Sequence, residues 1–163
     1  MSTDFYLQYI VPHSGIIIKI CRAYTNTSED FEDYYQEVCL QIWRSRDGFQ
    51  SQSEWSTWVY RVSLNVCLTL LKKKTNRNQE FASDYFPQAF HDDVNAFDND
   101  DLAELYNAIR QLSEINRAII LLYLEEKPYE VIANIIGLSA NNIGVRIKRI
   151  KQQLKTLLHG KIN

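Results

Sequence analysis

Apolar residues recur with the three- and four-residue spacing of an α-helix along most of this chain, in two separate blocks. The first block runs from about residue 5 to residue 74, with a break near residues 44–56, and the second covers about residues 102–158. Only five Gly and three Pro occur in 163 residues, so few positions would interrupt such helices. The pattern predicts an all-α fold and disfavours a β-sandwich or barrel, which would need many turns.

The segment between the two blocks has no helical period. Asn and Asp are frequent in it, and it contains Pro87, the only Pro between residues 13 and 127. A connection of about two dozen residues without a period is uncommon inside a compact domain. We therefore expect two small helical domains, residues 1–75 and 102–163, joined by a flexible acidic linker over residues 76–101. Each domain is near the size at which its own core is marginal, so we expect docking on a partner to be part of how it works.

The formal net charge of -2, from 18 Lys and Arg against 20 Asp and Glu, argues by itself against a dedicated nucleic-acid binder. The charges are unevenly distributed, however. Residues 80–104 contain eight acids and no Lys or Arg, whereas residues 140–163 contain six Lys and Arg and no acid. A second basic cluster, at residues 72–77, ends the first block, and acids crowd residues 29–37. The net charge is therefore the sum of oppositely charged segments. Taken alone, it does not exclude a nucleic-acid binder.

No run of about 18 apolar residues occurs, so we expect no membrane-spanning helix and no direct membrane insertion. Residues 1–10 carry an acid in place of the basic start of a signal peptide, and the apolar stretch at residues 15–20 is too short for one.

The cysteines, Cys21, Cys39 and Cys67, are far apart and lie among apolar residues. Buried free thiols in a reducing cytoplasm are the natural expectation, since a zinc site would need closer ligand pairs.

Residues typical of a catalytic site are not grouped in this sequence. His13, His91 and His159 lie in unrelated contexts, and there is no HExxH, GxSxG or glycine-rich phosphate loop. Asp92 and Asp93 follow His91 without a second ligand group nearby. We therefore expect a protein that is not an enzyme and that uses no metal or other cofactor.

Residues 128–158 have the pattern of a helix-turn-helix. Pro128 suits the first turn of a helix, and Gly137 is a natural left-handed stop for it. Ser139 can cap the next helix, which carries one apolar stripe. The stripe consists of Ile143, Ile147, Ile150, Leu154 and Leu157. Spacings of four, three, four and three place it on one face, toward a core.

The opposite face of the same helix is polar and basic, without an acid. It presents Asn141, Val145, Lys148, Arg149 and Gln152, with Asn142 and Arg146 at its edge. Such a face fits the major groove of DNA, where amides bond adenine edges, an apolar group contacts a thymine methyl and Lys or Arg binds phosphates. The alternative is an ordinary solvated face of a helical bundle. Gly144 is unexpected here, because it costs about 1 kcal/mol relative to Ala in a helix and removes a side chain from the face.

Three segments match, in order, sequence patterns of one protein family. Asp30-Phe-Glu-Asp-Tyr-Tyr-Gln-Glu37 with Leu40 and Trp43 is similar to the pattern D-x-E-D-x-x-Q-E…L…W. Residues 49–65, which begin FQSQSEWSTWVYR, resemble F-x-x-x-S-x-F-x-T-W-L-Y-R-I-x-x-N, and residues 112–117 and 129–139 resemble L-x-E-x-x-R and Y-x-E-I-A-x-x-L-G-x-S. The chain thus resembles, over nearly its whole length, the bacterial RNA polymerase sigma factors of the extracytoplasmic-function (ECF) type, within the sigma-70 family. The first two segments correspond to region 2 of that family and the last two to region 4.

The chain departs from the family pattern at several positions. Trp55 stands where Phe is commoner, and Ser113 where Pro usually precedes the glutamate. Asn141-Asn142 and Gly144-Val145 replace a Gly-Thr and a Lys/Arg-Ser pair. These departures leave the expected fold intact but leave the sequence of the upstream promoter element open.

Acids Asp30, Asp33 and Glu37 lie three and four residues apart, so on a helix they form one acidic stripe beside Gln36. The resemblance implies that this stripe docks on the clamp helices of the polymerase β′ subunit, with Trp43 as a nearby hydrophobic anchor. The plain alternative is a solvated acidic face. The resemblance also implies that the core polymerase contacts region 4, through the β flap.

Phe49 and Trp55 bracket a polar loop that includes Gln50 and Ser53. Aromatic walls with hydrogen-bonding groups between them suit an unstacked base, whose extrusion costs a few kcal/mol. Trp58 is expected in the core, because large aromatics usually bury most of their area. The helix that follows is expected to expose Thr57, Arg61, Asn65 and Lys72 on one side and to bury Val59, Val62, Val66 and Leu70 on another. The resemblance implies that the loop and the polar side bind the non-template strand of the -10 element.

The resemblance implies a factor that directs the polymerase core to promoter DNA and initiates transcription there. Region 2 would capture unpaired bases of the -10 element, and the linker would thread through the polymerase until RNA displaces it. An anti-sigma factor is a common partner in the family, although no residue here identifies one. Region 4 would read the -35 element as duplex through Asn141, Asn142, Val145, Arg146, Lys148 and Arg149.

Two other classes of protein share part of these features. A two-domain transcriptional regulator, whose first domain senses a signal or dimerises, would contain the helix-turn-helix. It would not need the pattern of residues 49–65 or the acidic stripe before it. A protein that binds only other proteins would fit the near-neutral charge. Salt-dependent promoter binding with polymerase, but not without it, would separate these cases.

Overall fold

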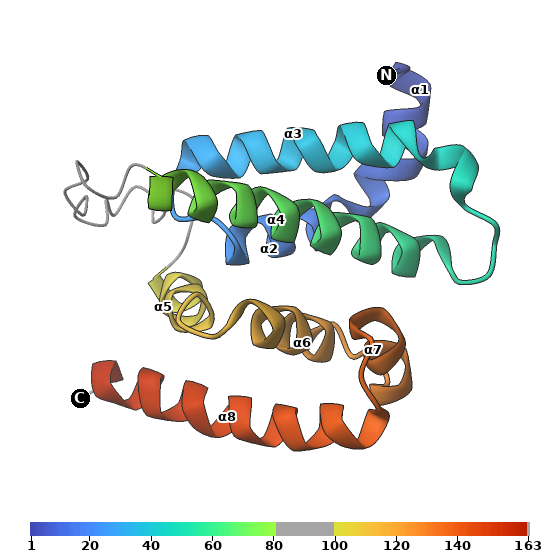
Figure 1. Cartoon of the computed structure of the whole chain (residues 1–163). Helices are drawn as coiled ribbons and strands as arrows, with labels where there is room; N and C mark the ends of the chain where they lie inside the picture. The colour runs from blue at the N-terminus through green and yellow to red at the C-terminus, as the bar shows by residue number, and fades with distance from the viewer. Residues whose placement is uncertain (81–99, 163) are drawn as a thin grey trace. The chain divides into compact units, whose positions relative to one another are not determined.

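The computed structural model describes residues 1–80 and 100–162, and every regular element in those ranges is helical (Figure 1). The prediction of an all-α fold is confirmed. Contacts divide the chain into two compact units, Met1–Ala96 and Phe97–Asn163. Within the described ranges, no helix combines the length and the apolar character needed to cross a membrane.

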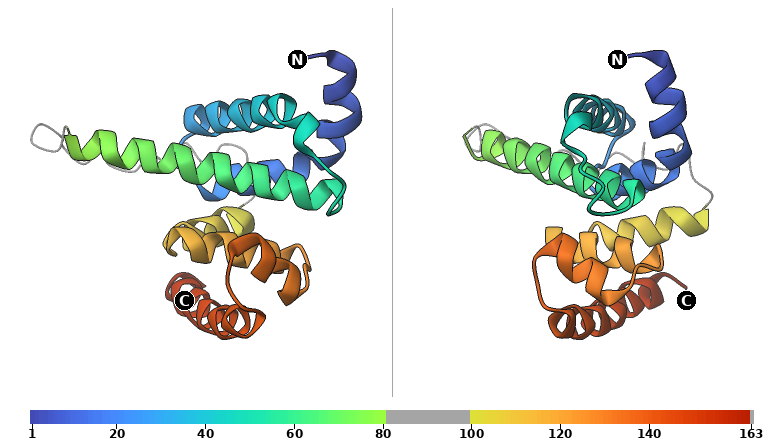
Figure 2. Two further views of the ribbon diagram at one scale, coloured as in Figure 1. Left: turned by 45° about the vertical axis from the view of Figure 1, so that its right-hand side comes forward. Right: turned by 90° about the vertical axis from the view of Figure 1, so that its right-hand side faces the viewer.

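The first unit is built on three main helices, preceded by a short irregular helical segment (Figure 2). The main helices are α2 (Ser14–Ala23), α3 (Ser28–Arg44) and α4 (Trp55–Glu80). The preceding segment consists of α1 (Thr3–Phe5), the π-helical turn η1 (Tyr6–Ile10) and the 3-10 turn η2 (Val11–His13). Another 3-10 turn, η3 (Arg46–Gly48), follows α3. Helices α3 and α4 lie side by side, and both contact α2.

Helices α2, α3 and α4 each bury one side in a shared core. Fully burying one aliphatic side chain contributes about 1.5–3 kcal/mol, so this core is the main source of stability for the unit. Its largest aliphatic members are Ile17 and Ile20 from α2, Val38 and Ile42 from α3, and Val59 and Leu64 from α4, joined by Ile10 of η1.

The buried side of α4 is not the predicted one. Of the predicted stripe only Val59 is fully buried, and Thr57, expected on the polar side, is buried too. The other members, Val62, Val66 and Leu70, are half-buried. The buried positions of this helix include instead Tyr60, Ser63, Leu64 and Cys67. Both series have helical spacing, so the period of the sequence could not distinguish them.

Helix α4 continues to Glu80, beyond residue 75 where the first domain was predicted to end. No Gly or Pro occurs at residues 75–80, so no residue there would interrupt the helix. The rest of the predicted linker up to residue 99 lies outside the described residues, and α5 begins at Asp100.

The second unit contains α5 (Asp100–Ile109), α6 (Glu114–Leu124), α7 (Tyr129–Ile136) and α8 (Ala140–Ile162). The predicted helix-turn-helix is confirmed in α7 and α8. Pro128 is the N-cap of α7, and Gly137 ends it in the left-handed region at φ +86°. The Ser139 hydroxyl accepts a hydrogen bond from the Asn142 N–H at 3.1 Å, as expected of an N-cap. The predicted stripe of α8 is buried at Ile143, Ile147, Ile150 and Leu154 and half-buried at Leu157.

Truncating a core residue of α3 should destabilise the first unit. Ile42 is fully buried, so Ile42→Ala should lower the free energy of unfolding by about 2–5 kcal/mol through lost burial and a residual cavity. Urea unfolding followed by far-ultraviolet circular dichroism would measure the change. Ile18→Ala is the matched control, because Ile18 is 41% exposed and its truncation should change stability by less than about 0.5 kcal/mol. Equal effects of the two variants would contradict the assignment of the core.

Candidate functional site

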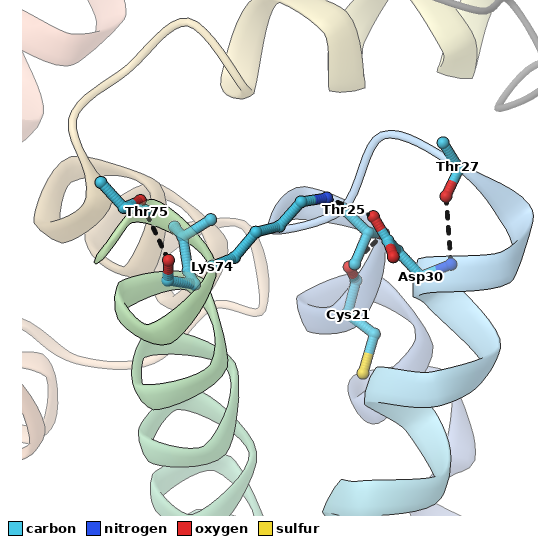
Figure 3. Close-up of polar contacts among 7 residues, drawn as sticks. Cys21, Thr25, Thr27, Asp30, Lys74 and Thr75 are labelled. Carbon is cyan, nitrogen blue, oxygen red and sulfur yellow. Dashed lines mark hydrogen bonds and ion pairs between the residues drawn. The ribbon is translucent and has the colours of Figure 1, made fainter. Parts of the chain in front are cut away.

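The acidic stripe lies along α3, which begins at an N-cap. The Thr27 hydroxyl accepts a hydrogen bond from the Asp30 N–H at 3.1 Å (Figure 3). Asp33, Gln36 and Glu37 are exposed farther along the helix, so their side chains are available to a partner. The helix thus presents the predicted acidic stripe to solvent, apart from its first member.

Asp30, the first member of the stripe, is engaged within the unit. Its carboxylate forms an ion pair with Lys74 of α4 at 2.5 Å (Figure 3). The two side chains are 28% and 48% exposed, so solvent screens much of their attraction. Lys74 belongs to the basic cluster at residues 72–77. The acidic stripe therefore balances part of the charge of that cluster. The pair joins the start of α3 to the distal part of α4.

Trp43, the proposed hydrophobic anchor, is half-buried and already has neighbours on its ring. The Arg46 guanidinium lies 3.7 Å from the ring centroid, and the same guanidinium donates to the Trp43 carbonyl at 2.6 Å. The Phe5 ring meets Trp43 edge to face, with centroids 5.1 Å apart. A partner would therefore meet a composite surface of these side chains and not an isolated indole.

Phe49 and Trp55 lie in a larger aromatic cluster. Their rings pack edge to face with centroids 5.1 Å apart, and Trp58 stacks on Trp55 at 4.8 Å. Trp58, predicted to lie in the core, is half-buried and stacks on Trp55. The loop aromatics thus contact each other directly, where the sequence suggested two separate walls.

The segment before α2 supplies a part of this cluster that the sequence reasoning missed. The Trp55 indole N–H donates to the Tyr9 carbonyl at 2.9 Å, and the Tyr9 ring lies 5.7 Å from that of Trp55. Phe5 lies between Tyr9, at 5.1 Å, and Trp55, at 6.3 Å. The high aromatic content of residues 5–9 was the only available signal, since Tyr9 and Trp55 are far apart in the sequence.

The polar residues predicted for this surface differ in accessibility. Gln50, Asn65 and Lys72 are exposed, whereas Ser53 and Arg61 are half-buried. The loop has a left-handed residue at Ser51, with φ +57°, a conformation uncommon for a residue other than Gly. A polar loop of unusual backbone geometry thus lies beside an aromatic cluster and ahead of exposed polar groups on α4.

Helix α8 has an exposed polar face, which we call the reading face, opposite its buried stripe. It consists of Asn141, Asn142, Val145, Lys148 and Arg149, all of which are exposed. Arg146 at its edge is half-buried, and its guanidinium donates to Asn142 at 3.1 Å and to Asn116 of α6 at 3.3 Å. Arg146 is therefore held in place by two amide oxygens, and Asn116 is a contributor that the sequence did not indicate.

Gly144, which was unexpected from the sequence, lies among residues of the reading face and lines one pocket with Asn141, Val145 and Lys148. A Cβ at this position would lie 3.4 Å from the Cε2 atom of Tyr129 on α7. The Tyr129 ring is therefore the nearest side chain to this position, at van der Waals distance from where a Cβ would lie. Farther along, the Lys151 ammonium lies 4.3 Å from the centroid of the Tyr123 ring. Tyrosines of α6 and α7 thus flank this side of the helix.

The three cysteines are free and buried, as predicted. The Sγ atoms of Cys21 and Cys67 are 4.0 Å apart, and their mutual hydrogen bond together with burial raises the pKa of Cys21. Burial raises the pKa of Cys39 to about 11. The Cys21 and Cys39 thiols are therefore protonated at neutral pH and poorly nucleophilic. In the described parts of the chain, no group of three or more His, Cys, Asp or Glu residues could hold a metal ion.

Both units match models of one protein family. The model described as Sigma-70 region 2 matches residues 10–77, and that described as Sigma-70, region 4 matches residues 102–154. The chain belongs to the sigma-70 family. The acidic stripe and the aromatic cluster thus fall largely in region 2, with Phe5 and Tyr9 just before the matched range, and the reading face falls in region 4.

Curated relatives of the chain carry ECF names. It is 28% identical to the ECF RNA polymerase sigma-E factor of Haemophilus influenzae, over 77% of this chain and 73% of that protein. It is 26% identical to the ECF RNA polymerase sigma factor SigW of Bacillus subtilis, over 95% and 89%. It is 33% identical to the ECF RNA polymerase sigma factor SigG of Mycobacterium tuberculosis over 66 residues, which are 40% of this chain and 18% of that longer protein.

A solved structure shares the fold. The sigma factor RpoE from Bartonella quintana, in complex with the anti-sigma factor NepR, matches with a TM-score of 0.77 and 21% sequence identity. The match covers 98% of this chain and 99% of that one. The likeness supports the all-α fold described above.

The Asp30–Lys74 pair should make a small, salt-dependent contribution to stability. A double-mutant cycle with Asp30→Asn and Lys74→Gln should give a coupling of about 0.2–1 kcal/mol, because both side chains are partly solvated. Urea unfolding at low and at high salt would measure the coupling, which should decrease as salt screens it. Lys73→Gln, at an exposed neighbour, should show no coupling to Asp30→Asn. A coupling unaffected by salt would contradict this description of the pair.

Proposed function

We propose that this protein is a sigma factor that directs the RNA polymerase core to specific promoters and initiates transcription there, in the cytoplasm. The observation that carries the proposal is the acid-free reading face of α8, positioned by a helix-turn-helix inside the segment that matches region 4. The proposed role is recognition and positioning, without catalysis by this chain. Curated relatives with ECF sigma names over most of the chain support it.

Region 4 would bind the -35 element as duplex DNA. The N-terminal part of α8 would enter the major groove, where the Asn141 and Asn142 amides can pair with base edges and Val145 can contact an apolar group. Lys148 and Arg149 would bind phosphates, while Arg146, held by Asn116 and Asn142, would be oriented in advance for a contact at the edge.

Region 2 would capture unpaired bases of the -10 element. Phe49 and Trp55 offer aromatic surfaces for stacking, and Gln50 and Ser53 offer hydrogen-bonding groups in the same loop. Since the rings contact each other, a base would have to displace one of them or stack on the outer surface of the cluster. Arg61, Asn65 and Lys72 would then guide the strand along α4.

Two surfaces would hold the polymerase core. The exposed acids Asp33 and Glu37, with Asp30, Gln36 and Trp43, would dock on the β′ clamp through complementary charge. On region 4, an apolar groove between α6 and α8 would receive the β flap. It is lined by Ile120, Tyr123, Leu124, Leu154 and Leu158, with Lys151, Lys155 and His159 among the lining residues.

In the domain organisation proposed from the sequence, a linker joins the two regions. This linker would thread through the polymerase. Most of that linker lies outside the described residues. An anti-sigma factor is a further proposed partner, suggested by the complex in which the Bartonella quintana protein was solved. The alternative of a two-domain regulator has no specific support, because the match to region 2 is unnecessary for it.

Transcription reconstituted with purified core polymerase over a random promoter library would test the proposed function. The expected result is enrichment of promoters with two common elements at a fixed spacing, only when this protein is added. Transcription that does not depend on the protein, or that selects no sequence, would refute the proposal.

Reversing two charges of the stripe should prevent assembly with the core. Asp33→Arg with Glu37→Arg should abolish binding to core polymerase while leaving helicity unchanged, since both side chains are exposed. Analytical gel filtration with core and circular dichroism would measure the two properties. The control, Asp4→Arg with Glu32→Arg, makes the same change in net charge at exposed acids outside the stripe and should retain binding. Retained binding by the first variant would refute the assigned role.

Arg149 should act on affinity without selecting sequence. If its guanidinium binds a phosphate, Arg149→Ala should weaken promoter binding of the holoenzyme on all sequences and reduce the slope of log K against log salt by about one unit. Titrations of labelled promoter at several salt concentrations would measure the slope. Arg44→Ala, at an exposed arginine at the end of α3, should leave it unchanged. A slope unaltered in Arg149→Ala would count against the phosphate contact.

A further inference from the structure

The centre of the reading face is apolar, although its surroundings are basic. Val145 is 50% exposed at this centre, and Tyr129 of α7 is 42% exposed beside it. Gly144 precedes Val145 on α8, and a Cβ there would lie 3.4 Å from the Tyr129 ring. Two exposed apolar side chains thus line one pocket together with a position that has no side chain.

These residues form an open pocket on the reading face. It is lined by Tyr129, Ala140, Asn141, Gly144, Val145 and Lys148, with no acid among them. The Tyr129 ring, the Val145 methyls and the backbone at Gly144 supply apolar surface. Asn141 and Lys148 supply polar groups at the same site, so a ligand that fits would have an apolar projection beside hydrogen-bond acceptors or phosphates.

The requirements of helix stability do not explain this arrangement. Gly inside a helix is unfavourable relative to Ala, and Tyr129 is too exposed to serve mainly as a core residue. An apolar pocket on a basic face is explained instead by the DNA groups that the face would bind. In the major groove, the base edges carry one apolar group, the C5 methyl of thymine, and it lies beside acceptor atoms.

We propose that this pocket binds the C5 methyl group of a thymine in the upstream promoter element, on either strand. Val145 and the Tyr129 ring contact the methyl, and Gly144 leaves the space that it enters. The inference deepens the proposed function and rests on it. It makes Tyr129 and Gly144 determinants of promoter sequence, and it predicts an A·T pair at the position that the centre of α8 meets.

Replacing thymine by uracil tests the proposal, because it removes the methyl group and keeps the Watson–Crick edge. The holoenzyme, made from the full chain and core polymerase, would first select a promoter from the random library. Each thymine of the upstream element, on both strands, would then be replaced singly by uracil. At one position the dissociation constant should rise about fourfold, as expected for one buried methyl group. Uracil in the spacer between the two elements is the control for general effects of the base.

Variants of the pocket then assign the effect to these residues. With Val145→Ala or Tyr129→Ala holoenzyme, the thymine promoter should bind more weakly, and the difference between thymine and uracil should fall below about twofold. Gly144→Ala should reduce the difference as well, because the added Cβ occupies part of the space. Ile18→Ala, at an exposed aliphatic residue of region 2 outside the proposed sites, should preserve the fourfold difference.

Several results would overturn the inference while leaving the proposed function intact. These are a selected upstream element without thymine on either strand, no uracil position that weakens binding, and a uracil effect that survives all three pocket variants. Failure of the holoenzyme to select any promoter would overturn the proposed function and the inference together. The two failures are therefore distinguishable, since the library selection precedes the uracil substitutions.

Discussion

Burial of a single apolar stripe on α8 decides what the second unit can present to a partner. Once Ile143, Ile147, Ile150 and Leu154 face the core, the geometry of a helix directs Asn141, Val145, Lys148 and Arg149 outward. No separate feature is needed to orient the reading face. The same constraint applies to α4, where burial of Tyr60, Leu64 and Cys67 leaves Asn65 exposed. The helical period therefore determines both which residues pack in the core and which are available for recognition.

How far the sequence predicts this structure depends on whether one apolar series dominates a helix. On α8 the Ile and Leu positions allow one choice, and both the stripe and the exposed face were predicted correctly. On α4 two series share helical spacing, and the choice between Val62 and Ser63 depends on the surfaces of α2 and α3. A small polar residue such as Ser63 can be buried because its hydroxyl donates to the Val59 carbonyl at 2.7 Å, which no pattern of apolar residues reveals.

Contacts between residues distant in the sequence were the other limit. The hydrogen bond from Trp55 to the Tyr9 carbonyl and the ion pair of Asp30 with Lys74 each join segments more than forty residues apart. Residue type and spacing predict which groups lie on one helix, but which helices meet is a property of the packed unit. The surroundings of Gly144 are of this kind too, since the side chain nearest to it, the Tyr129 ring, belongs to another helix. The acids of α3 were predicted from local spacing, whereas the pairing of Asp30 was not.

The aromatic cluster has a spectroscopic consequence. Trp43, Trp55 and Trp58 are the only three tryptophans in the chain, and all of them lie in this cluster of region 2. Intrinsic indole emission therefore reports on the surroundings of the proposed base-capture loop, and unfolding of region 4 contributes no indole signal of its own. If the proposed stacking of a base on this cluster occurs, indole emission from the unlabelled protein would report it. Region 4 contains tyrosines but no tryptophan. Indole emission, which is resolved from tyrosine emission by wavelength, therefore reports on region 2 alone.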